Sequence, residues 1–124
     1  MTADELYSIE LNEWNRVIDF YFAELDIFKE RLTEVADKNN KQSVTTGIEH
    51  FQNQFIVQNE ALQGLRHDVH RQQLEITAEV KKAAKIINMD IVDAEFLLRD
   101  RVHVAEKILL ELKHSFYRFL AKVL

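Results

Sequence analysis

Apolar residues in the first third of the chain recur at alternating spacings of four and three, without a break. The series is Tyr7, Leu11, Trp14, Ile18, Tyr21, Leu25, Phe28, Leu32 and Val35. This period places every member on one side of a helix that packs as helices do in coiled coils, whereas a half-buried strand alternates with a period of two. The pattern predicts a helix over about residues 4–38, with Asp4 as its N-cap.

A second segment with the same period follows the polar connection "DKNNKQS". Its apolar positions run from Val44 to Ile76, but Gln58 and Gln72 occupy two of the core positions. We expect a helix over about residues 43–88. Its start is either a Thr46–Glu49 capping box or, slightly earlier, Ser43.

A third segment carries the period from Ile91 to Val123, with Glu95 at one core position near its start. Asp90 is the expected N-cap, and the predicted helix continues to the C-terminal end of the sequence.

The scarcity of turn residues limits how these segments can be connected. The 124 residues contain no proline and only two glycines, Gly47 and Gly64. Sheet proteins need more of both, so the fold class is predicted to be all-α, a single domain over residues 1–124. The expected architecture is an antiparallel bundle of three long helices with heptad packing. We favour a continuous second helix, because a lone glycine does not break a helix; a bend at Gly64 would instead give four helices.

Charge and composition exclude several classes of function. The chain has no cysteine, so disulfides and thiolate zinc sites are excluded. The first forty residues carry ten acids against four bases, which disfavours nucleic acid as a partner. No basic segment followed by an apolar run opens the sequence, and no uncharged apolar stretch approaches 18 residues, so a cytoplasmic protein that does not enter membranes is expected.

The first and third predicted helices carry apolar residues beyond those that one core requires. A surface helix needs a single apolar stripe, and a wider apolar face is typical of an interface. These residues predict a homodimer or higher homo-oligomer, most simply a two-fold dimer, or contact with another protein. The candidate interface residues are Phe20, Phe22, Phe96, His103, Leu110 and Tyr117.

Two histidines, His67 and His70, are the candidate metal ligands. Residues three apart on a helix are neighbours, so the two imidazoles could hold one divalent ion. Arg71, four residues after His67, would repel a cation, and Asp68 points about 100° away from His67. A third ligand would have to come from another helix, and the alternative is a hydrated polar surface.

The remaining acidic and histidine pairs form no catalytic constellation. His103 lies between Asp100 and Glu106, and Glu111 precedes His114 by three residues, but such spacings occur freely in charged helices. We therefore expect a non-enzymatic, self-associating interaction or scaffold protein without a cofactor. The alternative hypothesis is a metal-binding helical bundle that uses surface or interfacial histidines.

Overall fold

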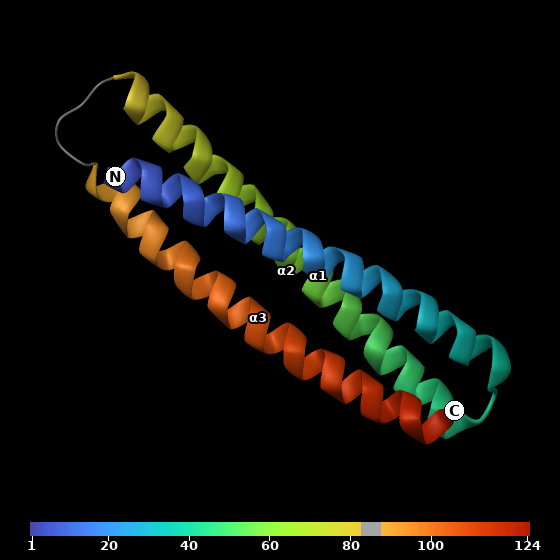
Figure 1. Cartoon of the computed structure of the whole chain (residues 1–124). Helices are drawn as coiled ribbons and strands as arrows, with labels where there is room; N and C mark the ends of the chain where they lie inside the picture. The colour runs from blue at the N-terminus through green and yellow to red at the C-terminus, as the bar shows by residue number, and fades with distance from the viewer. Residues whose placement is uncertain (83–87) are drawn as a thin grey trace.

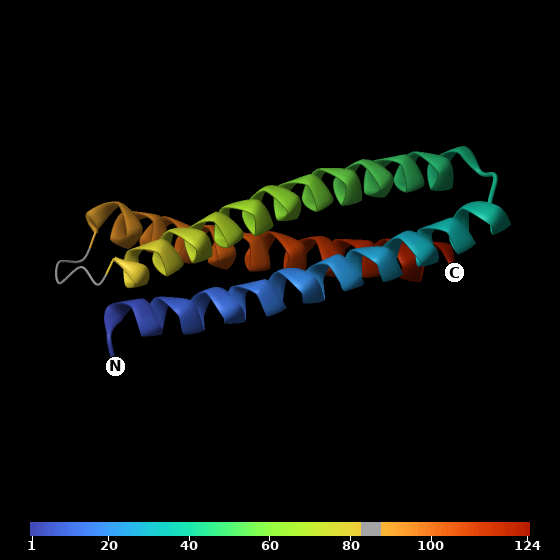
Figure 2. The ribbon, with the colours of Figure 1, turned by 90° about the horizontal axis from the view of Figure 1, so that it is seen from above.

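Three long helices form an antiparallel bundle, as the sequence predicts (Figure 1). The computed structural model describes residues 1–82 and 88–124. Within them α1 spans Ala3–Lys38, α2 spans Gln42–Lys81 and α3 spans Met89–Val123. Since each connection reverses the direction of the chain, α1 and α3 run parallel to each other and antiparallel to α2 (Figure 2).

The middle helix passes through Gly64 without a break, so the four-helix alternative is excluded. The second helix is nevertheless shorter than predicted, because α2 ends at Lys81 and not near residue 88. The heptad series of the sequence extends beyond Ile76 to Val80, Ala83 and Ile87, and it predicts these residues in the core. Val80 is instead exposed, and Ala83 and Ile87 lie outside the described residues. The three helices have 36, 40 and 35 residues, so they are similar in length.

All three predicted N-caps are wrong. The N-cap of α1 is Thr2, which forms a capping box with Glu5, so Asp4 lies in the first turn. Helix α2 begins at Gln42, and the hydroxyl of Thr46 donates to the carbonyl of Gln42 inside the helix instead of capping it. The N-cap of α3 is Asn88, whose side chain accepts from the backbone N–H of Asp90. In α1 and α3 the actual N-cap lies two positions before the predicted one: Thr2 replaces Asp4, and Asn88 replaces Asp90. The side chain at the earlier position accepts a hydrogen bond from a free N–H group of the first turn.

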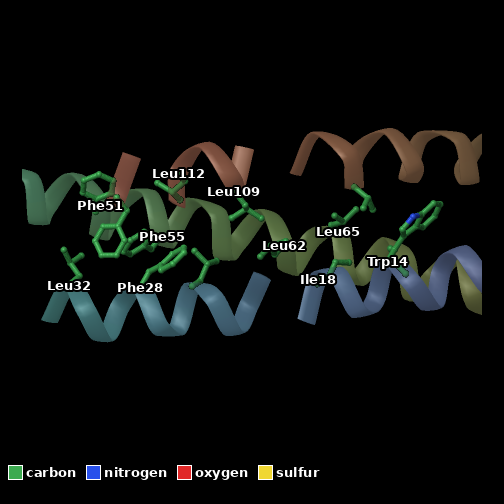
Figure 3. Close-up of a cluster of buried hydrophobic side chains, with 14 of the residues drawn as sticks. Trp14, Ile18, Phe28, Leu32, Phe51, Phe55, Leu62, Leu65, Leu109 and Leu112 are labelled. Atoms are coloured by element: carbon green, nitrogen blue, oxygen red, sulfur yellow. The ribbon is translucent and has the colours of Figure 1, made fainter. Parts of the chain in front are cut away.

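The predicted register of the core is confirmed. The heptad positions point inward from Leu11 to Val35, from Val44 to Ile76 and from Ile91 to Phe116, and the side chains of Leu11, Ile18, Leu25, Phe55, Val69 and Phe116 are completely buried. Figure 3 shows apolar side chains from the three helices meeting along the axis of the bundle. Burial of these side chains supplies the main free energy that stabilises the fold.

One end of the core is a cluster of phenylalanines. The ring centroids of Phe28, Phe55 and Phe116 lie 5.1–5.8 Å apart, at tilted and edge-to-face angles that aromatic rings prefer. Phe51 extends the cluster toward Phe119, whose ring centroid lies 5.2 Å from that of Phe51. One phenylalanine from α1, two from α2 and two from α3 therefore hold this end together.

Helix α2 packs closely against both of its neighbours, whereas α1 and α3 contact each other less. In Figure 1, α1 and α3 are neighbours in the half of the bundle that holds the N-terminus, and α2 is drawn between them in the other half. Packing between α1 and α3 is therefore the least extensive of the three helix pairs.

Candidate interaction surface

Two ion pairs join α1 to α3. Arg99 donates from Nη2 to Glu10 Oε1 at 2.6 Å and from Nε to Glu10 Oε2 at 2.8 Å. Lys113 Nζ donates to Glu24 Oε1 at 2.9 Å. These hydrogen bonds lower the pKa of Glu10 and raise that of Lys113. The ion pairs therefore mark the side of α1 that faces α3 and the side of α3 that faces α1.

Apolar side chains lie directly beside these ion pairs. Helical neighbours are separated by three or four residues. On α1, Leu6 and Phe20 precede the two glutamates by four residues and Ile27 follows Glu24 by three. On α3, Phe96 precedes Arg99 by three residues and His103 follows it by four. Leu110 and Tyr117 flank Lys113 with the same spacings. We call these seven residues the α1–α3 face: Leu6, Phe20, Ile27, Phe96, His103, Leu110 and Tyr117.

The α1–α3 face is exposed along its whole length. Its six apolar side chains have between 45% and 61% of their surface accessible to solvent, with Phe96 the most exposed. The charged groups cover part of the aromatic surface: Arg99 Cζ lies 5.0 Å from the ring centroid of Phe96, and Lys113 Nζ lies 5.6 Å from that of Tyr117. These cation–π contacts hold the two rings beside the ion pairs.

The two helices present their apolar residues at matching heights. Both ion pairs join residues whose numbers differ by 89, so parallel α1 and α3 keep one register over two heptads. That register brings Leu6 within one residue of the height of Phe96, and Phe20 within one residue of the height of Leu110. Ile27 and Tyr117 are related in the same way. The face is therefore a series of paired apolar residues that flank the ion pairs.

Phe22 does not belong to this face, although it was predicted as an interface residue. Its side chain is half-buried on the α2 side of α1, and the guanidinium carbon of Arg66 lies 4.5 Å from its ring centroid. Arg66 also forms an ion pair with Asp19. A partner at the α1–α3 face would not contact Phe22. The other five predicted interface residues lie together on the face.

The candidate metal ligands His67 and His70 are both exposed on α2. They line a shallow cavity of about 570 Å³, together with Asp19 and Arg66. Asp19, the acidic residue of this cavity, is already paired with Arg66, which brings a positive charge to the site. Within residues 1–82 and 88–124, no three histidine, cysteine or acidic side chains converge to hold a metal ion.

The other histidines are also on the surface. His103 is exposed on the α1–α3 face, and His114 is exposed further along α3. His50 lies with its ring edge-on to Phe51, at a centroid separation of 4.9 Å. None of them lies in the core of this bundle.

A buried polar cluster is the feature that sequence reasoning missed. Glu95 of α3 has no exposed surface, and Gln72 of α2 is 4% exposed. Gln72 Nε2 donates to the Ile91 carbonyl at 2.8 Å and to Glu95 Oε1 at 3.1 Å. Both residues interrupt an apolar heptad series, and two such interruptions on neighbouring helices are the signal that could have paired them.

Comparisons do not assign the chain to a family. It was compared with models of known protein families, with curated proteins and with solved structures, and none of the three comparisons found a match. Among the described residues, no helix has an apolar stretch long enough to cross a membrane. Any functional assignment must therefore come from the surface of the bundle itself.

Proposed function

We propose that this protein is a non-enzymatic interaction or scaffold module that associates with a second copy of itself, as a two-fold dimer, through the α1–α3 face. The observation that carries the proposal is the arrangement of exposed apolar side chains at matching heights on two parallel helices. Single exposed apolar residues are common on soluble proteins, but a continuous patch is typical of an interface.

The size of the patch supports a dimer. If a buried aromatic side chain contributes about 150–250 Å² and an aliphatic one about 60–120 Å², the six half-exposed side chains present on the order of 500 Å². A standard interface buries about 800 Å² on each partner. The apolar residues thus supply more than half of that area, and the polar side chains of Glu13 and His103 lie between them, each seven residues from an apolar residue on either side.

The charges on this face favour an identical partner. The whole chain has a net charge of −5, so two copies repel each other on average. On the α1–α3 face, however, Glu10 and Glu24 are each neutralised by a basic residue of the same chain. Two copies can therefore approach here with less repulsion than at the acidic surfaces of α1.

A matched pair of leucine variants tests the proposal. Leu110 on the face is 49% exposed and Leu74 on α2 is 57% exposed, so either can be replaced by glutamate without burying a charge in the bundle. We expect Leu110→Glu to weaken self-association at least tenfold in sedimentation equilibrium, because it would place an unpaired charge in the interface. Leu74→Glu should leave the dissociation constant unchanged. Equal behaviour of the two variants would contradict the proposal.

A further inference from the structure

The buried cluster around Glu95 joins all three helices. Glu95 belongs to α3, Gln72 to α2 and Glu10 to α1. Besides its contact with Gln72, Glu95 has the carboxyl group of Glu10 as a close neighbour. The carboxylate of Glu10 also accepts two hydrogen bonds from Arg99, one from Nε and one from Nη2. A polar layer thus crosses a core that is otherwise apolar.

Two carboxyl groups can share a hydrogen bond only if one of them carries a proton. Glu95 Oε1 accepts from Gln72, whereas Glu95 Oε2 is buried and has no donor in the described part of the chain. Glu10 accepts from Arg99 through both of its oxygens, which stabilises its ionised form. A protonated Oε2 of Glu95 would be a donor, and the Glu10 carboxylate beside it is a ready acceptor.

We propose that Glu95 is a proton-binding site inside the bundle, which holds a proton near neutral pH and donates it in a hydrogen bond to the carboxylate of Glu10. The proton would satisfy the buried oxygen that otherwise has no partner. It would also remove the repulsion between two carboxylates, which a core of low dielectric makes severe. The site would make the connection between α1 and α3 dependent on pH.

The charges that surround Glu95 support this assignment. Helix α1 presents Glu10, α3 presents Arg99, and α2 presents only the uncharged amide of Gln72. Burial is the main cause that raises the pKa of Glu95 to about 7; Glu10 acts in the same direction, and Gln72 and Arg99 oppose it. Arg99 does not neutralise Glu95, because its guanidinium is already committed to Glu10.

This inference does not depend on the proposed dimer. The test is a pH titration of the glutamate side-chain carboxyl carbons by NMR, on the full chain uniformly labelled with carbon-13. We expect the Glu95 resonance to titrate near pH 7, and that of Glu10 to titrate below the ordinary value of 4.5. A Glu95 midpoint close to 4.5 would overturn the proposal without affecting the proposed self-association.

Two variants separate proton sharing from burial alone. Glu10→Gln removes the like charge and releases Arg99, so the Glu95 midpoint should fall by about one pH unit or more. Glu24→Gln removes the other carboxylate that joins α1 to α3 and should leave the Glu95 midpoint in place. Identical Glu95 midpoints in the two variants would show that Glu95 is not paired with Glu10.

Discussion

Gly47 of α2 lies against the ring of Phe119 of α3 so closely that a Cβ atom at this glycine would be 2.3 Å from the ring. The glycine therefore lets the Phe119 ring rest on the backbone of α2, at the end of the phenylalanine cluster. Gly64, in contrast, has open space at the corresponding position: apart from its chain neighbours and the backbone of its own helix, no atom of the described residues lies within 4 Å. The two glycines of the chain should respond differently to the same substitution.

Gly64→Ala is expected to stabilise the fold by about 0.5–1 kcal/mol, because alanine is the better helix former and meets open space. Gly47→Ala gains the same propensity but must displace the Phe119 ring, and such overpacking typically costs about 1–3 kcal/mol. Urea denaturation of the two variants measures both effects. A Gly47→Ala protein as stable as Gly64→Ala would contradict the close approach of Phe119.

A large-to-small substitution tests the register of the core. Leu109 is 2% exposed, so Leu109→Ala should lower the free energy of unfolding by about 2–5 kcal/mol. Its control is Leu97→Ala on the same helix, where the leucine is 60% exposed and the loss should stay within about 0.5 kcal/mol. Normal thermal stability of Leu109→Ala would show that the helix faces are wrongly assigned.

The raised pKa of Glu95 gives stability a defined dependence on pH. The folded protein holds this proton up to about pH 7, whereas the unfolded chain releases it near pH 4.5. The stabilising contribution is therefore fully present below pH 4.5, falls as the pH rises, and is lost above about pH 7. At 1.36 kcal/mol for each pKa unit, the loss is on the order of 3 kcal/mol.

The comparison that isolates this effect is between the natural chain and Glu95→Gln. Both contain all the other titratable groups, so the difference between their unfolding free energies should shift in favour of the variant between pH 4.5 and 7. Glu34→Gln, at an exposed glutamate of α1, serves as the control and should follow the natural chain. A constant difference between the natural chain and Glu95→Gln would contradict the buried proton.

Zinc should not stabilise the protein at micromolar concentration. His67 and His70 could each donate a nitrogen, but Arg66 places a positive charge in the same cavity and pairs with Asp19. Two histidines without a third ligand make a weak site. Calorimetric titration with zinc checks this expectation; stoichiometric binding that His67→Ala abolishes would establish the metal-binding hypothesis instead.

The sequence predicts the course of the helices well, because each helix repeats its apolar residues over many heptads. Predictions that rest on single residues, such as the N-caps, are less accurate. The N-caps of α1 and α3 fail because two polar residues near each helix start compete for the same N–H groups, and a shift of two positions leaves the helix pattern unchanged. The N-cap of α2, Lys41, makes no side-chain hydrogen bond to the helix. The heptad series alone does not distinguish Thr2 from Asp4.

The candidate surface could be predicted in part. Phe96, Leu110 and Tyr117 are separated by multiples of seven residues, so one helix presents them on the same side. Phe22 shows the limit of this reasoning. It lies two residues from Phe20 and therefore on a different side of α1, where Arg66 of α2 packs over its ring. The pairing of Glu10 with Arg99 likewise depends on the relative height of two helices, which no local pattern specifies.

The most direct test of the account is the mass of the protein in solution, measured by light scattering behind a sizing column over a range of concentrations. Self-association through the α1–α3 face predicts about twice the 14.7 kDa of the single chain at high concentration. Dilution should shift the mass toward the monomer, and Leu110→Glu should produce the monomer at concentrations where the natural chain is a dimer. A natural chain that stays at 14.7 kDa up to millimolar concentration would contradict the proposed function.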